Sequence, residues 1–495
     1  MAEMTTVDLF ALAPELAVLT GALLVLLVEL FLPTDHKQQV NGIGVVSVLV
    51  GLAFVVALAV DGADRFAFGN MFVVDSYALL FKAFFLSVAL FVLFLSYRYF
   101  AEIRTYQGEY YFLLLSAFLG CMLMASARDL VMIFIALELV SVPGFVMAGL
   151  RKFDLRSNEG AMKFFLIGVL SVAVLLYGLS VVYGFTGTTD LEGVAVALRE
   201  LGDIPLLNAS ILFVIVGFGF KISAVPFHFW APDTYEGAPV PVTAFLSVAS
   251  KAAGFAGLLQ VCFVAFEPVA DVWAVPLGII AVVTMTVGNL TAMSQDNIVR
   301  LLAYSSIGHA GYMLVPFAVV SAGAVETNRT AFAAVVLYLL AYGIMNTGAF
   351  AAVVAVTRGD PTRLLSDYAG LGRRATGTAL ALTLALLSLG GLPLLVGFWA
   401  KFFVFRAAVV AGTGFGIFLA AAVVINSVVA MFYYLKVLRT MWMDEPTSEV
   451  ELRPGFALNF ATFGLAVLTV GAFFAFDLFA RAADLSTLIL ASAGG

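Results

Sequence analysis

The chain is a succession of apolar stretches, each about 20 residues long, joined by short polar connections. A helix of about 20 residues spans the hydrocarbon core of a bilayer, so each stretch predicts a membrane-spanning helix. Composition agrees, because 63% of the residues are hydrophobic and 12% are charged, a larger apolar share than in soluble domains. We predict an all-α integral membrane protein with about 14 spans, near residues 11–32, 41–60, 75–97, 109–126, 129–150, 160–183, 208–229, 240–266, 272–293, 299–320, 330–357, 376–407, 412–440 and 456–480.

Basic residues are shared unequally between the two alternating sets of loops. About fourteen fall in one set, from Lys37 to Arg453, and about five in the other, from Arg65 to Arg481. Positive residues concentrate on the cytoplasmic side, which places the first set there and predicts both termini outside. No basic residue precedes the first apolar run, so we expect a retained helix and not a signal peptide.

Five ionisable residues lie deep inside the apolar spans, and they are the candidate proton carriers: Glu138, Lys163, Lys221, Lys251 and Lys401. Charges inside a membrane are costly and mark conduction paths. Burial lowers the proton affinity of a lysine and a nearby carboxylate raises it again, so such groups can load and unload protons. The alternative is a static ion pair that fixes helix packing. One pair would not explain four lysines.

The partners of these groups are open at this point. Glu138 needs a cation, and Lys163 or Lys221 could supply it. Lys163 and Lys82 also lie near span ends, where snorkelling of the ammonium to the interface is the alternative.

Two histidines are candidate relay groups. His228 follows Lys221 by seven residues, which places it on roughly the same face of a continuous helix, about 10 Å along the axis. His309 has Tyr304, Ser305, Ser306 and Tyr312 nearby in the sequence. For either histidine, the alternative is a hydrogen-bonded core residue without a transfer role.

The seventh and twelfth spans share the pattern Gly-Phe-x-x-Lys, at 217–221 and 397–401, and both are interrupted by proline or glycine. A broken helix in a membrane is tolerated only where protein or water satisfies its backbone. The two copies lie five spans apart and therefore run in opposite senses, as in an inverted repeat of spans 4–8 and 9–13. The predicted division is 1–108 for spans 1–3, 109–267 and 268–442 for the two repeats, and 443–495 for span 14 and the tail.

Some connections carry their own predictions. Residues 185–207 have helical apolar spacing and predict an amphipathic helix on the outer surface. Residues 230–241 contain three prolines and predict a stiff turn instead of a regular helix. We expect Asp233, Asp296 and Asp367 to be caps or subunit contacts, and Arg128 to pair with Asp129.

Several function classes are disfavoured. The two cysteines are isolated, the three histidines are too few for a usual metal cage, and no glycine-rich phosphate loop or basic stripe is present. We therefore expect no metal, no bound cofactor and no nucleic acid.

Three segments carry a family resemblance: FGFKISAVPFHFWAPDTYEGAPVPVTAFLSVASK at 218–251, RLLAYSSIGHAGY at 300–312 and LGGLPLLVGFWAK at 389–401. They resemble the antiporter-like membrane subunits of respiratory complex I and of multisubunit sodium/proton antiporters. Within that family they look like the subunit N branch of bacterial NADH-quinone oxidoreductase. The related subunit M typically has Glu where Lys401 stands, and subunit L typically has a long lateral helix. Val240 departs from the more frequent Thr.

The resemblance implies a non-redox, proton-translocating subunit in the bacterial cytoplasmic (inner) membrane. The whole complex would use NADH, FMN, iron–sulfur clusters and quinone, and a K-like and an M-like subunit would flank this chain. The five carriers map onto the positions named above, with protons passing from Lys221 through Lys251 to Lys401. A sodium/proton antiporter subunit and a structural scaffold are the alternatives, and a ferredoxin-driven relative is a variant of the main interpretation.

Overall fold

The computed structural model describes residues 6–62, 64–103, 107–357, 363–446 and 456–484. These residues are mostly helical, which confirms the all-α class. The α-helices are α1 (Thr6–Ala11), α2 (Ala13–Glu29), α3 (Val40–Asp61), α4 (Ser76–Ile103), α5 (Gln107–Ser126), α6 (Leu130–Ala148), α7 (Leu155–Thr186), α8 (Leu191–Leu201), α9 (Pro205–Lys221), α10 (Trp230–Gly237), α11 (Val240–Phe245), α12 (Lys251–Gln260), α13 (Ala270–Met293), α14 (Ile298–Leu314), α15 (Val325–Thr357), α16 (Leu371–Arg374), α17 (Thr376–Gly390), α18 (Val396–Val410), α19 (Gly414–Met443), α20 (Phe456–Phe474) and α21 (Phe476–Asp484).

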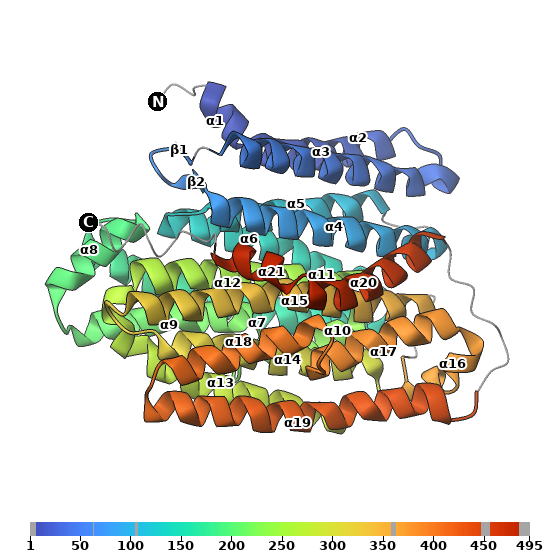
Figure 1. The fold of residues 1–495 in the computed structure, drawn as a ribbon. Helices are drawn as coiled ribbons and strands as arrows, with labels where there is room; N and C mark the ends of the chain where they lie inside the picture. Colours follow the sequence, from blue (N-terminus) through green and yellow to red (C-terminus); the bar gives the residue numbers. More distant parts are fainter. Residues whose placement is uncertain (1–5, 63, 104–106, 358–362, 447–455, 485–495) are drawn as a thin grey trace.

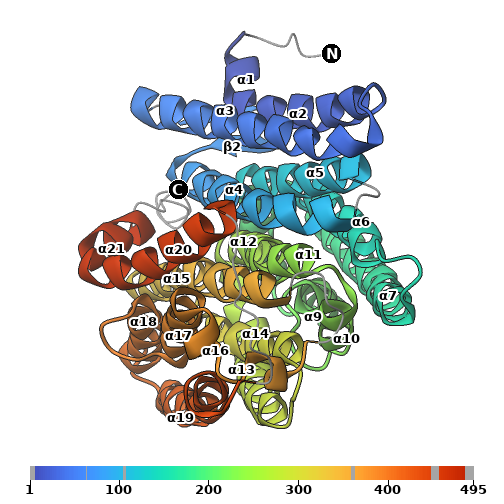
Figure 2. The same cartoon turned by 90° about the vertical axis from the view of Figure 1, so that its right-hand side faces the viewer.

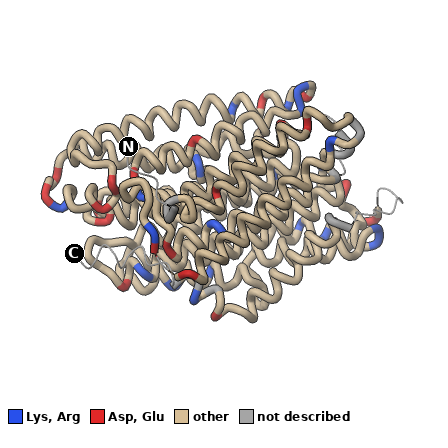
Figure 3. The backbone as a smooth tube through the Cα atoms, turned by 90° about the horizontal axis from the view of Figure 1, so that it is seen from above, with Lys and Arg blue, Asp and Glu red and all other residues tan. Residues whose placement is uncertain are grey.

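Each predicted span coincides with a helix or with a pair of helices. Ten described helices are long and apolar enough to cross a membrane, and Pro205–Lys221, Thr376–Gly390 and Leu458–Phe474 are shorter apolar helices. Charged residues gather mainly toward the two ends of the bundle, with few between them (Figure 3). The predicted placement of both termini concerns residues outside the described ranges.

The helices run side by side in a bundle, and α2 and α3 form a separate layer against α4 and α5 (Figures 1 and 2). The amphipathic helix α8 lies at one end and α16 at the other (Figure 1). In the first predicted repeat α5 packs on α6, and α7 packs on both α9 and α10; in the second α13 packs on α14, and α15 packs on both α17 and α18. This pairing is the one that a repeat of spans 4–8 and 9–13 predicts, and the division into four segments stays a prediction.

A hairpin of two short strands, β1 (Arg65–Ala67) and β2 (Phe72–Val74), is a feature that the all-helical prediction omits. The strands are antiparallel, with Arg65 opposite Val74. The turn between them contains Gly69 and Asn70 at positive φ, which these two residue types tolerate best.

Both predicted helix breaks are present. Residues 222–229 separate α9 from α10, and residues 391–395 separate α17 from α18. Lys221 is the last residue of the helix before its break, whereas Lys401 lies in the helix after its break. The shared Gly-Phe-x-x-Lys pattern therefore does not mark equivalent positions.

The prediction of a non-helical turn at 230–241 is wrong. Residues 230–237 form α10, and α11 starts at Val240. Pro232 and Pro241 lie in first helical turns and Pro239 is an N-cap. Backbone N–H groups in a first turn have no partner within the helix, so proline costs little there.

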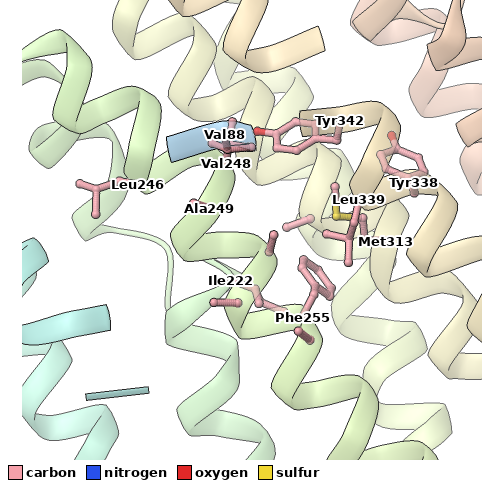
Figure 4. Packing of buried hydrophobic residues seen from close by; sticks show 14 of the residues in the cluster. Val88, Ile222, Leu246, Val248, Ala249, Phe255, Met313, Tyr338, Leu339 and Tyr342 are labelled. Atoms are coloured by element: carbon pink, nitrogen blue, oxygen red, sulfur yellow. The ribbon is translucent and has the colours of Figure 1, made fainter. Parts of the chain in front are cut away.

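The eighth span lies at the centre and is wholly buried. It is not a uniform helix, because π-helical segments Leu246–Ser250 and Val261–Ala265 flank α12. Apolar side chains of α4 and α15, among them Val88 and Leu339, lie around its own apolar residues, such as Phe255 (Figure 4). Isolated π-turns are frequent at functional sites. The segment Leu246–Ser250 is directly followed by Lys251.

The remaining short helices are 3-10 segments, at Thr34–Gln39, Glu267–Val269, Val315–Val319 and Leu365–Tyr368. They cap or link the long helices. The last of them belongs to the connection between α15 and α16.

Candidate functional site

Lys221 lies at the end of α9 and is 3% exposed. Its Nζ donates a hydrogen bond of 2.9 Å to Oγ of Ser141 on α6. Glu138 lies one turn before Ser141, close enough to interact electrostatically with Lys221. Its Oε1 accepts no hydrogen bond from the described residues. Lys221 is therefore the cation that the structure brings near Glu138.

The predicted pairing of Glu138 with Lys163 is not formed. Nζ of Lys163 instead lies 2.6 Å from Oε1 of Glu159 and 2.6 Å from Oδ2 of Asp233. The side chain of Lys163 is 42% exposed. A lysine points back toward the N-terminus of its helix, here the end that carries Arg156, so the snorkelling interpretation describes its position.

Asp233 is more than the cap or subunit contact that we predicted. Its Oδ1 accepts a 2.7 Å hydrogen bond from Arg300 on α14, and its Oδ2 binds Lys163 on α7. Burial alone would raise the pKa of the Asp233 carboxyl, but the two hydrogen bonds and the positive charges hold this pKa below its usual value.

Lys251 is the first residue of α12 and is 1% exposed. Its Nζ donates to the backbone oxygen of Ser306 at 2.7 Å and to the Oγ of the same residue at 2.6 Å. The Ser306 hydroxyl also accepts from the Tyr342 hydroxyl at 2.9 Å, and Asn346 donates to Tyr342 at 2.8 Å. A polar chain therefore runs from α12 through α14 into α15.

His309 is buried in α14 between two tyrosines. Its Nδ1 lies 2.7 Å from the Tyr338 hydroxyl, and its Nε2 lies 3.2 Å from the Tyr434 hydroxyl. Tyr434 is 2.5 Å from Oγ of Ser305. The relay candidate thus has hydrogen-bond partners on both ring nitrogens, from α15 and α19.

Lys401 lies on α18 and is 8% exposed. Its Nζ donates at 2.8 Å to the backbone oxygen of Gly390, the last residue of α17. The helix break frees this carbonyl from its usual partner. The ammonium also lies 4.9 Å from the centre of the Tyr312 ring, whose hydroxyl accepts from Asn289.

The three central lysines share one property. No ion pair within the described ranges includes Lys221, Lys251 or Lys401. Their hydrogen-bond acceptors are hydroxyls and backbone carbonyls, which are neutral. Such lysines are costly to bury when charged. Their surroundings therefore suit a side chain that changes its protonation state better than one that holds helices together by charge.

His228 does not join this chain of contacts. The break after Lys221 removes the shared helical face on which its role was predicted. Its ring is buried, and its Nδ1 has no hydrogen-bond partner among the described residues. It packs against Phe229.

Two predictions about charges elsewhere are wrong. Lys82 does not snorkel, because it is 0% exposed and its Nζ lies 2.8 Å from Oε1 of the buried Glu15. Arg128 binds Asp75 at 2.5 Å and Gln260 at 2.6 Å. Asp129 instead caps α6.

The sequence prediction missed the neutral members of the site: Ser141, Tyr338, Tyr342, Asn346, Asn289, Tyr434 and the Gly390 carbonyl. A hydroxyl or amide inside an apolar span is a weak signal, since such groups often bond to their own helix, as Ser116 does. Tyr304, which was expected beside His309, is not one of its hydrogen-bond partners.

Comparisons with known proteins identify the family of this chain. The model of the family described as "NADH:quinone oxidoreductase/Mrp antiporter, TM" matches residues 127–429. The chain is 41% identical to NADH-quinone oxidoreductase subunit N of Trichlorobacter lovleyi, with 90% of each chain covered. It is 40% identical to subunit N 2 of the same enzyme from Rhizobium meliloti, covering 94% of this chain and 95% of the relative.

Solved structures show the same fold. A chain of respiratory complex I from Thermus thermophilus superposes with a TM-score of 0.78 at 31% identity, covering 94% of this chain and 98% of the other. A chain of the Mrp complex from Dietzia sp. gives 0.81 at 20% identity, covering 99% and 100%. At that identity the second likeness speaks for the fold alone.

Proposed function

Because this chain belongs to the NADH:quinone oxidoreductase/Mrp antiporter family of membrane proteins, we propose that its buried lysines carry protons across the membrane. It is an antiporter-like, proton-translocating membrane subunit of NADH-quinone oxidoreductase, of the subunit N type. The multisubunit sodium/proton antiporter is the weaker alternative, since its structural relative shares 20% identity.

One observation carries the assignment of the carriers. Lys221, Lys251 and Lys401 are buried in the spans and bind only neutral groups among the described residues. A scaffold built on charges would pair each lysine with a carboxylate, because an unpaired buried charge destabilises a fold. A lysine that alternates between its charged and neutral forms needs hydrogen-bond acceptors that are themselves neutral, because such acceptors can bind either form.

The proposed order follows the polar contacts. A proton taken up from the cytoplasm reaches Lys221 beside Ser141, moves to Lys251, and continues past Ser306. His309, held between Tyr338 and Tyr434, would relay it toward Lys401, from which it leaves outside. Water would bridge the intervals that exceed hydrogen-bond distance.

Glu138 would set the charge state of Lys221. It is half-buried, and it lies near the stripe of α6 that exposes Ile135 and Val142. A carboxylate at this depth is costly against lipid, so a neighbouring membrane subunit is the favoured cover. Glu138 would thereby receive a signal from that neighbour. Lys163, bound to Asp233, takes part from the cytoplasmic side.

The wider context also belongs to this proposal. The chain would act as a non-redox subunit, flanked by K-like and M-like membrane subunits in a bacterial inner membrane with both termini outside. NADH, FMN, iron–sulfur clusters and quinone would be bound by other subunits. His228 remains a candidate relay group only if water connects it to the chain of contacts.

The test is NADH-driven proton pumping, measured together with NADH-quinone turnover, in membranes that contain the assembled complex with Lys221→Ala, Lys251→Ala or Lys401→Ala. Lost pumping with normal assembly would support the carriers. Unchanged pumping and turnover would show that these lysines are structural. Glu138→Gln tests the signalling role in the same way.

A further inference from the structure

The half-helix α10 packs closely against α7, and it also contacts α9 through a 3.3 Å hydrogen bond from the Trp230 indole to the Phe220 carbonyl. A Cβ on Gly160 of α7 would lie 2.7 Å from the backbone oxygen of Asp233, and one on Gly237 would collide with the backbone of Arg156. Thr234 also donates a 2.9 Å hydrogen bond to the Gly160 carbonyl. The backbones of α7 and α10 therefore touch. We treat α7 and α10 as one unit.

Arg300, in the first turn of α14, connects this unit to the second half of the chain. Its Nη1 donates to Oδ1 of Asp233 at 2.7 Å and to Oε2 of Glu236 at 2.8 Å. Both acceptors belong to α10. Arg363 adds hydrogen bonds to the carbonyls at the end of α10, but these go to the backbone and do not depend on a titratable group.

Lys163 shares the same carboxylate through a separate oxygen. It binds Oδ2 of Asp233 whereas Arg300 binds Oδ1. Lys163 can thus lose its proton or move away without displacing Arg300 from Asp233. Loss of the Lys163 charge would still change the electrostatic environment of Arg300, because both cations bind Asp233. The ion-pair cluster contains three cations and three carboxylates: Lys163, Arg156, Arg300, Glu159, Asp233 and Glu236.

Arg300 lies on the helix that holds the acceptor of Lys251. Ser306 follows it by six residues, about 9 Å along α14. A pull on the first turn of α14 is transmitted along the helix, since its backbone hydrogen bonds make it stiff. The position of the Ser306 hydroxyl relative to Lys251 would change with it.

We propose that Arg300 is a positioning residue that couples Lys163, through Asp233 and Glu236 on α10, to the contact between Lys251 and Ser306. The proposal rests on the carrier function proposed above. It adds a second connection between α7 and α14, through the ion pairs of Asp233 and Glu236, which ends at the Lys251–Ser306 contact.

The experiment compares Arg300→Gln and Arg300→Lys in the assembled complex, with Lys436→Gln as the matched control. Lys436 also binds a carboxylate beside α14, Asp296, but that pair is exposed. We expect Arg300→Gln to lower the number of protons pumped per electron several-fold, Arg300→Lys to restore part of it, and Lys436→Gln to leave it unchanged. If Arg300→Gln fails to assemble, Asp233→Asn with Glu236→Gln removes the same contacts.

A double-mutant cycle separates coupling from a structural role. If Arg300 acts through Lys163, then Lys163→Gln combined with Arg300→Gln should lose much less than the product of the two single losses. Single losses that multiply would overturn the proposal, because they would show independent action. So would an Arg300→Gln variant that pumps normally.

Lys251→Ala, measured in parallel, distinguishes failure of the coupling by Arg300 from failure of the carrier function. Lost pumping in Lys251→Ala together with normal pumping in Arg300→Gln would overturn the coupling alone. Normal pumping in Lys251→Ala would overturn the carrier function on which the coupling rests.

Discussion

The ammonium of Lys251 donates to both the backbone oxygen and the hydroxyl of Ser306, at 2.7 and 2.6 Å. The two residues belong to different predicted repeats, on α12 and α14. This contact is where the first half of the site meets the second, and π-helical residues immediately before Lys251 set its direction.

Ser306→Ala should slow pumping by about ten- to a hundredfold, because a hydrogen bond to a charged group contributes about 1.5–3 kcal/mol. The backbone oxygen would remain as an acceptor, so activity should not vanish. Proton pumping by assembled complex is the measurement. The control is Ser116→Ala, whose hydroxyl binds only its own helix. Equal activity in the two variants would argue against a role for the Ser306 hydroxyl.

Tyr434→Phe should lower pumping several-fold, since it removes the hydroxyl that contacts His309 and Ser305. Tyr338→Phe should act similarly through the other ring nitrogen. The matched control is Tyr368→Phe, a buried tyrosine whose hydroxyl has no hydrogen-bond partner among the described residues. A loss of the same size in the control would mean that packing, and not proton relay, explains the effect.

Asp233→Asn should lower the thermal stability of the complex by the same amount at pH 6, 7 and 8. The folded-state pKa of Asp233 is lowered. Its ion pairs are therefore complete above the usual Asp value of about 4 and are lost only as the pH falls through the lower folded value. Melting temperatures of the parent and the variant provide the test. A difference that shrinks between pH 8 and pH 6 would contradict the lowered pKa.

Gly160→Ala should destabilise the protein by about 1–3 kcal/mol, because its Cβ would press on the backbone of α10. Gly184→Ala in the same helix is the control. A Cβ there meets nothing within 4 Å, and the intrinsic helix preference of alanine should make it slightly stabilising. Melting temperatures of the assembled complex distinguish the two. Similar melting temperatures for the two variants would show that α10 can move away from α7 at little cost, which would argue against treating the two helices as one unit.

Lys82→Met should destabilise the protein by about 3–5 kcal/mol, because it leaves the Glu15 carboxylate buried without its cation. The double variant Glu15→Leu with Lys82→Met should recover most of this loss. Lys37→Met, which breaks a more exposed pair with Glu29, should cost about 1 kcal/mol or less. The measurement is thermal unfolding of the complex. A double variant as unstable as Lys82→Met would show that the pair contributes more than mutual charge compensation.

Sequence patterns were sufficient for features that depend on local chemistry. The spans followed from apolar length, the break after Lys221 from a proline, and the break before Lys401 from glycines. The prediction of a turn at 230–241 failed because proline is tolerated in the first turn of a helix, and Pro232 occupies that position. The expected relation of His228 to Lys221 failed because helical spacing has no meaning across a break.

Partners were the least predictable part of the site. The sequence left Lys163 and Lys221 open as partners for Glu138. Lys163 lies instead against Asp233, which we had expected to be a cap or a subunit contact. The sequence also placed Lys82 at the interface, whereas Glu15 allows it to be fully buried. In both cases a carboxylate far away in the chain decided the outcome.

By itself, the sequence determined a helical membrane protein with charges deep inside its spans, because apolar length and ionisable residues are read directly from the order of amino acids. Only the tertiary structure decided which neutral groups receive each lysine, that Lys163 pairs with Asp233, and that Arg300 on α14 binds two carboxylates of α10. Those relations depend on which helix faces meet. Helix packing brings together residues more than a hundred positions apart, and no local pattern records it.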